Sequence, residues 1–359
     1  MIWKQGVWPA FPVRGTAGTI RKKGERVMAS EKFKKAYLPA HPEVWSLSRI
    51  VIDEDRCSGC GNCVEACPMA CLEVVDKTAR QIDGVVCISC SACVSHCEKG
   101  AANMQGFYNV EEGVFKTKLF HPEEGYPDVP DVEGIDGLTL VEEVIYKRRS
   151  NRIYSKAPLP DELVRRVVEA ARYAPSHGNC QPWSFIIIND RDEMDHIAKK
   201  MDVFYRLLTK FYWSGKKNPV TRRILSMFCA VAPGMTDQRG ITGGTAILQP
   251  TDVFLGAPCL ILILADTRGM NDPGIDIGIC GTNMVLAAHS LGLVTCWMSF
   301  TIGINYLPKL KKELGIGWPY KVATAIVMGY PRVNADTMVK RELPPITWRK
   351  GGKVWTEMP

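Results

Sequence analysis

Nine of the fourteen cysteines lie between Cys57 and Cys97, and eight of them form two runs that share one spacing, C-x2-C-x2-C-x3-C. The first run contains Cys57, Cys60, Cys63 and Cys67, and the second contains Cys87, Cys90, Cys93 and Cys97. The short turns in each run place three thiolates on three irons of one cubane, and the chain then leads the fourth cysteine away to the other cubane. The spacing predicts two [4Fe–4S] clusters. Their ligand sets are Cys57, Cys60, Cys63 and Cys97, and Cys87, Cys90, Cys93 and Cys67.

The two runs differ in the residues around the fourth cysteine. Pro68 follows the first run, whereas Glu98 follows the second. A carboxylate beside a thiolate should lower the potential of that cluster or alter the turn. Cys71 lies outside the ligand pattern, and we interpret it as a small core residue. Zinc is the alternative metal, but it needs four ligands in two pairs, not two triplets plus two singles.

A second group of residues suited to ligand binding follows an amphipathic helical pattern that ends near Lys147. It contains Arg148, Arg149, Ser150 and Arg152. Guanidinium groups and a hydroxyl in this arrangement can bind a phosphate dianion through bidentate hydrogen bonds. A basic helix end that faces only solvent is the alternative. Residues 174–183, A-P-S-H-G-N-C-Q-P-W, form the next unusual segment, between a predicted helix and a predicted strand.

Together these segments resemble the nitroreductase family of FMN enzymes, which use R-R-S-x-R and A-P-S-x-x-N-x-Q-P-W at these relative positions. Further matches are Gly256-Ala257-Pro258, residues 283–293 leading into Thr295-Cys296-Trp297, Gly329-Tyr330-Pro331 and Lys340-Arg341. The resemblance covers residues 139–350. The cysteine-rich segment in turn resembles the bacterial ferredoxins that carry two [4Fe–4S] clusters.

The resemblance implies a set of flavin contacts. Arg148, Arg149, Ser150, Arg152 and Arg341 would hold the phosphate and ribityl chain of FMN. Pro175, Ser176 and Asn179 would contact the isoalloxazine ring, and Thr295, Cys296 and Trp297 would line its other side. Family members are domain-entwined homodimers with FMN at the interface, so each flavin would be bound by both chains. We assign no catalytic residue, because water can supply the protons.

The chain divides into four zones. Residues 1–48 form an irregular leader, in which Met28 is a second candidate for the first residue, and residues 49–105 form the cysteine-rich module. Residues 106–138 form an acidic linker rich in Pro and Gly, and residues 139–359 form the FMN domain. In that domain the apolar patterns predict a helix capped by Asp161, a helix over 277–291, and strands at 185–188, 260–264, 294–298 and 322–328. The expected fold class is α+β, an α/β sandwich with a covered sheet, preceded by the small ferredoxin-like domain.

The formal net charge of +7 is concentrated at the start of the chain. Residues 1–27 hold six basic residues against Glu25, and the remainder carries only +2, which argues against binding to nucleic acid. The longest apolar run, 254–265, contains Gly256 and Pro258 and is too short to cross a membrane. With no clear signal peptide, we expect a cytoplasmic protein.

Residues 199–239 are basic and aromatic, and they form a longer stretch than small family members have at this place. Two interpretations stay open: a lid over the flavin suited to an anionic conjugated substrate, or a helix pair packed on the domain with a solvated basic face.

The two modules together suggest a direction for electrons. Low-potential clusters deliver single electrons and FMN stores one or two. The first hypothesis is an enzyme that reduces a small organic acceptor: a nitro group, an activated C=C bond or a carbon–halogen bond. The alternative is an electron-transfer flavoprotein that relays electrons between ferredoxin-type carriers and a protein partner. Flavin-destroying or dehydrogenating chemistry is a third possibility on this fold. The sequence leaves the donor, ferredoxin or NAD(P)H, open.

Overall fold

The computed structural model describes residues 45–46, 49–83, 87, 90–105, 109–110, 138–217, 220, 252–268, 272–333 and 346–357. The predicted leader, almost all of the linker, Arg341 and the part of the basic aromatic segment beyond residue 220 lie outside these ranges.

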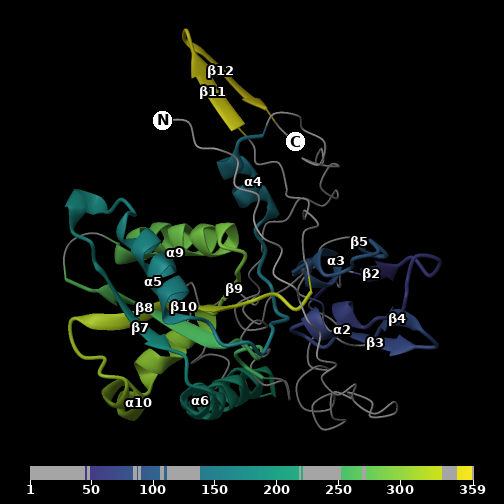
Figure 1. Cartoon of the computed structure of the whole chain (residues 1–359), viewed down its shortest axis with the longest axis horizontal. Helices are drawn as coiled ribbons and strands as arrows, with labels where there is room; N and C mark the ends of the chain where they lie inside the picture. Colours follow the sequence, from purple (N-terminus) through teal and green to yellow (C-terminus); the bar gives the residue numbers. More distant parts are fainter. Residues whose placement is uncertain are drawn as a thin grey trace.

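The cysteine-rich module consists of two small antiparallel sheets and two short helices (Figure 1). Strand β2 (Arg49–Ile52) pairs with β5 (Ala102–Gln105), and β3 (Leu72–Val75) pairs with β4 (Thr78–Gln81). The helices are α2 (Asn62–Ala66) and α3 (Ala92–Ser95). A further short pair, β1 (Trp45–Ser46) with β6 (Asn109–Val110), flanks the module in the sequence. Buried cysteines such as Cys63 and Cys93 pack in one cluster with Ile50, Met69 and Leu72. The thiols are therefore part of the core of this module.

The larger domain is built on a four-stranded sheet with the order β7-β8-β10-β9, in which all neighbours are antiparallel. The strands are β7 (Trp183–Ile188), β8 (Cys259–Asp266), β9 (Val294–Trp297) and β10 (Tyr320–Gly329). Each contains the corresponding predicted strand apart from Met298, the last residue of the segment expected at 294–298. This sheet and its helices confirm the α+β prediction.

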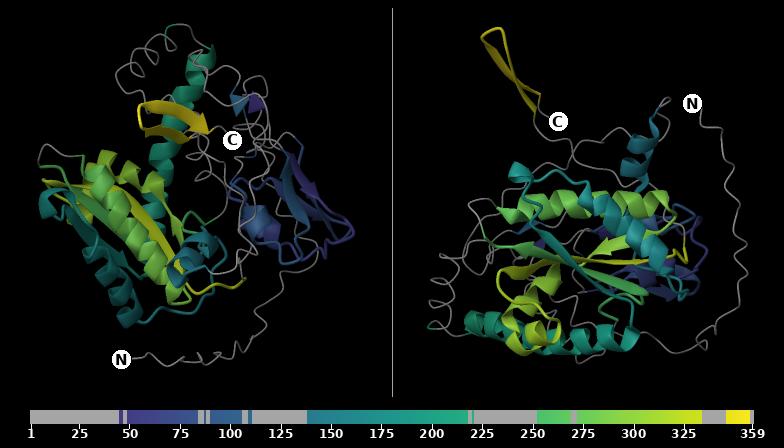
Figure 2. Two further views of the ribbon diagram at one scale, coloured as in Figure 1. Left: turned by 90° about the horizontal axis from the view of Figure 1, so that it is seen from above. Right: turned by 60° about the vertical axis from the view of Figure 1, so that its left-hand side comes forward.

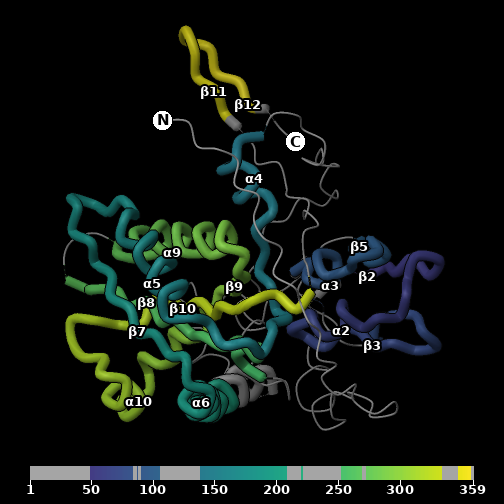
Figure 3. The backbone as a smooth tube through the Cα atoms, viewed as in Figure 1, coloured from purple at the N-terminus to yellow at the C-terminus, as the bar shows by residue number. Residues whose placement is uncertain are grey.

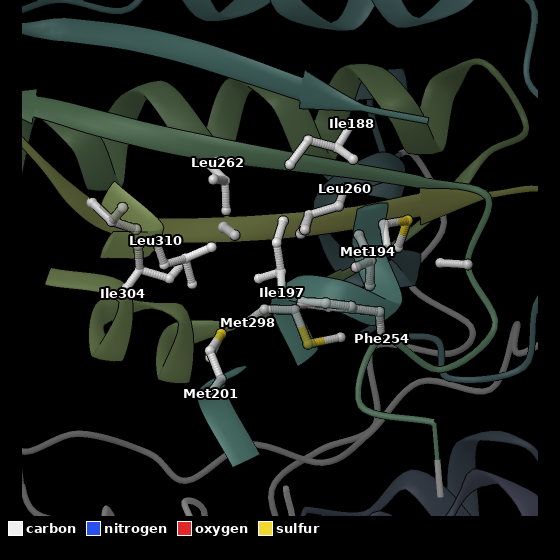
Figure 4. Packing of buried hydrophobic residues seen from close by; sticks show 14 of the residues in the cluster. Ile188, Met194, Ile197, Met201, Phe254, Leu260, Leu262, Met298, Ile304 and Leu310 are labelled. Carbon is white, nitrogen blue, oxygen red and sulfur yellow. The ribbon is translucent and has the colours of Figure 1, made fainter. Parts of the chain in front are cut away.

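Helices cover both faces of the sheet, as Figure 2 shows. Strand β8 is apolar at nearly every position, so it can bury both faces. Leu260, Leu262 and Leu264 pack into one core with α6 (Arg191–Lys217), η4 (Ser299–Tyr306) and α10 (Pro308–Glu313). Figure 4 shows this core, in which Ile197 and Met201 of α6 lie against the strand residues. Ile261 and Ile263 pack into the other core, with α5 (Asp161–Arg172) and α9 (Pro273–Ser290).

Two helix starts differ from the prediction. Asp161 is the first residue of α5, and Pro160 occupies the N-cap position without a side-chain hydrogen bond, so Asp161 is not the cap. Its carboxylate still lies in the first turn, where it interacts favourably with the helix dipole. Helix α9 begins before residue 277 because the Asp272 side chain accepts a hydrogen bond from the Gly274 N–H at 2.8 Å.

The first part of the basic aromatic segment lies in α6 and packs on the domain. Phe204 stacks on Tyr306 with ring centroids 5.6 Å apart, and the Tyr205 hydroxyl donates to the Phe300 carbonyl oxygen at 2.5 Å.

Figure 3 shows the hairpin of β11 (Ile346–Lys350) and β12 (Lys353–Glu357), which extends from the domain.

Candidate functional site

The eight predicted ligand cysteines line two separate cavities. Cys57, Cys60, Cys63 and Cys97 line one, which we call the outer cavity. Cys67, Cys87, Cys90 and Cys93 line the other, the inner cavity. Within the described residues, no group of three or more His, Cys, Asp or Glu side chains is arranged to hold a single metal ion. The grouping crosses between the two runs, as the spacing predicts.

Local backbone conformation positions the thiols. Gly59 and Gly61 adopt left-handed conformations, with φ of 67° and 80°, in the turns between the first three cysteines. At Gly59 a Cβ atom would lie 2.3 Å from the Lys77 carbonyl oxygen, so only glycine fits there. The backbone N–H of Ala101 points at the Cys97 sulfur, at 3.1 Å. Such N–H···S hydrogen bonds stabilise thiolates, and the residues therefore fit [4Fe–4S] clusters.

The thiols of each cavity disfavour one another's ionisation. Burial raises the pKa of Cys63 to about 11, and the neighbouring thiols Cys97, Cys60 and Cys57 add to this shift. Burial also raises the pKa of Cys93 in the inner cavity. Four thiolates in one small space repel one another unless a cation compensates them. Binding of iron would supply that compensation and release the protons.

The first group of predicted flavin residues comes together at strand β9. Ser150 forms a parallel bridge with Thr295, and the Asn151 N–H donates to the Thr295 carbonyl oxygen at 3.0 Å. Burial raises the pKa of the Cys296 thiol. The positive charges of Arg152 and Arg148 and a hydrogen bond with Ser150 act in the opposite direction and lower this pKa. Two segments far apart in sequence therefore form one group that is rich in hydrogen-bond donors and positive charge, which suits a phosphate.

One guanidinium nitrogen of Arg149 also stabilises the end of a helix. Its Nη1 donates to the carbonyl oxygens of Tyr146 and Arg148, at 2.5 and 2.7 Å. Both carbonyls belong to the C-terminal end of α4 (Leu140–Lys147), where helix carbonyls lack partners within the helix. In this chain Arg149 therefore caps the helix that precedes the phosphate-type segment.

The second group, residues 175–181, forms a strained loop. Asn179 and Gln181 have positive φ angles of 55° and 48°, which are uncommon for residues other than glycine. The Ser176 hydroxyl oxygen accepts a hydrogen bond from the Gln181 N–H at 3.0 Å, and the Asn179 side chain accepts one from the Gln181 side chain at 3.2 Å. Strain of this kind is typical of functional loops.

Asp276 on α9 holds this loop, although it was not among the residues predicted from the sequence. Its carboxylate is buried and accepts a hydrogen bond from the His177 N–H at 3.2 Å, with the Cys180 sulfur 3.8 Å from its other oxygen. The available signal was that Asp276 is the only acidic residue of this largely apolar helix. The remaining predicted contact, Trp297, lies against Gly281 of α9, where a Cβ atom would meet its ring at 2.3 Å.

The cysteine-rich module contacts the segment that carries Ser150 and Arg152. Ala66 and Ala92 of the module are buried in one cluster with Ile153 and Val333 of the larger domain. Arg332 forms an ion pair with Glu65. These contacts place the α2–α3 side of the module against the predicted flavin residues.

Arg152 immediately precedes Ile153, one of the residues of this contact. Its Nη1 donates to the Ser150 carbonyl oxygen at 3.3 Å. Burial lowers the pKa of its guanidinium, but the net shift is upward because Cys296, Cys90, Tyr154 and Cys67 interact with its charge. This partly buried cation therefore lies near both β9 and the thiols of the inner cavity.

Two thiol-lined cavities beside a group of arginines at β9 are typical of an oxidoreductase with metal–thiolate centres. Residues 145–330, more than half of the chain, match the family model described as "Nitroreductase family", and the chain belongs to that family. Residues 23–102 match the model described as "4Fe-4S dicluster domain". The sequence resemblance is thus confirmed, and the predicted cofactors, FMN and two [4Fe–4S] clusters, agree with both assignments.

Known proteins similar to this chain match its larger domain. Rat iodotyrosine deiodinase 1 is 27% identical over 202 residues, 54% of this chain and 62% of the relative. The nitrobenzene nitroreductase of Ectopseudomonas oleovorans is 26% identical over 199 residues, 53% of this chain and 86% of the relative. A nitroreductase structure from Desulfitobacterium hafniense with bound FMN is 22% identical, covers 60% of this chain and all of that one, and has a TM-score of 0.44. Among the described residues, no helix is both long and apolar enough to cross a membrane.

Proposed function

We propose that this chain is an FMN-dependent oxidoreductase in which two [4Fe–4S] clusters pass electrons to FMN for the reduction of a small organic acceptor. The observation that carries the proposal is the position of Arg152. This residue belongs to the predicted FMN phosphate group and also interacts with Cys67 and Cys90 of the inner cavity. The docked module therefore brings the candidate cluster site next to the candidate flavin site in one chain.

The proposed ligands are the four cysteines of each cavity. When bound, the clusters supply one-electron steps and FMN supplies storage of one or two electrons. The backbone N–H groups of Cys71 and Ala101 stabilise the thiolates of Cys67 and Cys97, to whose sulfurs they donate at 3.2 and 3.1 Å. The buried contacts around Ala92 and Ile153 hold the two modules together and exclude water between them.

Arg148, Ser150 and Arg152 would bind the FMN phosphate, and the loop held by Asp276 would position the isoalloxazine ring. The proposed assembly is a homodimer with FMN between the chains. Helix α4 supports this because Leu140 and Val141 are 81% and 66% exposed, and a second chain would cover them.

The proposed acceptor class rests on one kind of reaction that the relatives' names have in common, a two-electron reduction that removes an atom from an organic molecule. A nitro group that takes two electrons and two protons loses one oxygen as water and becomes a nitroso group. An aryl halide that takes two electrons and one proton releases a halide ion. Two relatives are named for a nitro substrate and for removal of iodine. Electrons would come from a ferredoxin-type carrier or from NAD(P)H, and protons from solvent.

Anaerobic single-turnover mixing of the full chain tests the proposal. Reduced ferredoxin, NADH and NADPH are compared as donors, and the absorbance of the clusters and of FMN is followed. With ferredoxin we expect the clusters to be reduced before FMN, and a nitroaromatic or haloaromatic acceptor then to reoxidise both. Reduced clusters that leave FMN oxidised would contradict the proposal. If reduced FMN passes electrons to a protein partner but to neither small acceptor, the chain is an electron-transfer flavoprotein instead.

A truncated chain without residues 1–105 is the matched control. Both cores of the larger domain consist of residues beyond 153, so this domain has its own core. The truncated chain should bind FMN and dimerise, keep any direct reduction by NAD(P)H and lose reduction by ferredoxin. If it accepts ferredoxin electrons as fast as the full chain, the clusters are not on the electron path.

A further inference from the structure

We infer that the two clusters are inequivalent: the inner cluster has the higher reduction potential and passes electrons to the flavin, and Cys71 and Arg152 give it this property. The inner cluster is the one that Cys67, Cys87, Cys90 and Cys93 would hold. The electron order rests on the proposed function, whereas the difference in potential does not.

The two halves of the module share one backbone framework. The Cys71 N–H points at the Cys67 sulfur at 3.2 Å, and thirty residues later the Ala101 N–H points at the Cys97 sulfur at 3.1 Å. The preceding residues, Ala70 and Gly100, both adopt left-handed conformations, with φ of 50° and 58°. Because the backbones correspond, a difference between the cavities must come from side chains and surroundings.

Cys71 is the first difference. It is fully buried, it lines the inner cavity, and its thiol makes side-chain hydrogen bonds with Cys67 and Cys87. Ala101, at the corresponding place in the outer cavity, has no side-chain donor. An S–H group that donates to ligand sulfurs stabilises the added negative charge of a reduced cluster and raises its potential.

The residue after each fourth cysteine is the second difference. Pro68 lines the inner cavity, and Glu98 lines the outer cavity. A carboxylate disfavours the more negative reduced state, so Glu98 lowers the potential of the outer cluster relative to the inner one. This difference has the same sign as the first.

Arg152 is the third difference. It is partly buried, and its charge acts on Cys67 and Cys90. Lys99, which lines the outer cavity, and Arg56, which precedes Cys57 and lies against Gly100, are exposed, so water and salt screen their charges. Arg152 also interacts with the His96 ring, which lines the outer cavity and lies next to Asn151. In the inner cavity, however, its charge acts on two of the ligand thiols themselves, Cys67 and Cys90.

These differences give a downhill order. With the cysteines of each cavity holding a cluster, an electron from a ferredoxin-type carrier would pass from the outer cluster to the inner cluster and then to FMN. After a second electron has followed, the acceptor takes both electrons together with protons from solvent. No further reductant is needed.

A redox titration of the full chain monitored by electron paramagnetic resonance tests the inference. The two signals are assigned with Cys60→Ser and Cys90→Ser, each of which perturbs one cluster. Cys71→Ala should shift the inner signal to lower potential and leave the outer signal in place. Cys71→Ser, which keeps a donor, should restore most of the shift, and Ala101→Cys should shift the outer signal to higher potential.

The charge of Arg152 is tested in the same way. Arg152→Gln should lower the potential of the inner cluster, while the matched variant Arg56→Gln should not. FMN loss in Arg152→Gln does not affect the readout, because the cluster signals are measured directly. The inference is overturned if Cys71→Ala leaves both potentials unchanged or shifts both equally. It is also overturned if Cys71→Ala and Arg152→Gln shift the potentials of different clusters.

Failure of this inference can be distinguished from failure of the proposed function. The titrations need no acceptor and no flavin reduction. Shifts as expected, combined with FMN that stays oxidised in single-turnover mixing, would preserve the inequivalent clusters and reject the proposed function. Unchanged potentials combined with normal flavin reduction would reject only the inference.

Discussion

The side chain of Arg332 in the larger domain forms an ion pair with Glu65 of helix α2, which leads directly into Cys67. Both side chains are about half exposed, at 51% and 52%. An exposed pair of this kind contributes only about 0–1 kcal/mol. The buried contact of Ile153 with Ala66 and Ala92 must therefore provide most of the stability of the docked module.

We predict that Ile153→Asp releases the module from the larger domain, because it places a charge in a buried apolar contact. Small-angle X-ray scattering should show a larger radius of gyration, and proteolysis should cut between the modules. Ile302→Asp, at a position 46% exposed on η4, is the control and should change neither measurement. Arg332→Glu should have only a small effect. A radius unchanged in Ile153→Asp would mean that other contacts hold the module.

Anaerobically purified protein should contain about eight irons and eight sulfides per chain, as expected for two cubanes. Cys57→Ala should reduce the iron content by up to about half while FMN stays bound, because Cys57 lines only the outer cavity. Iron and sulfide assays with the FMN absorbance measure both. Cys180→Ala, at an exposed cysteine of the larger domain, should retain all the iron. Zinc without iron in the wild-type protein would reject the cluster assignment.

The double variant Arg148→Ala, Arg152→Ala should lose FMN and retain its clusters. The two guanidinium groups lie near Cys296, where they would supply charge-assisted hydrogen bonds of about 1.5–3 kcal/mol each to the phosphate. The FMN released on denaturing the purified protein gives the stoichiometry. Arg172→Ala, whose arginine pairs with Glu169 on the surface of α5, is the control. Stoichiometric FMN in the double variant would locate the phosphate elsewhere.

Asp276→Ala should destabilise the larger domain by about 1–3 kcal/mol, because the partly buried hydrogen bond from the His177 N–H to this charged carboxylate is lost. FMN affinity should fall as well, since residues 176–181 lose their support. Asp276→Asn keeps an oxygen acceptor and should be affected less. Chemical denaturation and FMN fluorescence titration measure the two effects. If FMN affinity is unchanged in Asp276→Ala, the loop does not contact the flavin.

Local pattern was enough to predict much of this protein. The cysteine spacing predicted the two groups of four thiols, because turns of two residues and short helices have few alternative geometries. The apolar runs predicted strands β7, β8, β9 and β10, and most clearly β8, because a strand buried on both faces is apolar at nearly every position. The helix starts were predicted less accurately. The N-cap of α5 is Pro160 and not Asp161, and α9 is capped by Asp272 and begins before the predicted residue 277.

Tertiary structure alone decided which segments meet. The lone acid Asp276 could be picked out in the sequence, but its role in holding the loop of His177 could not, and neither could the hydrogen bonds from Arg149 to the end of α4. The sequence also left Cys71 as a core residue and Arg152 as one arginine among several. Their positions beside Cys67 depend on packing between segments distant in sequence, whose side-chain contacts no local periodicity encodes.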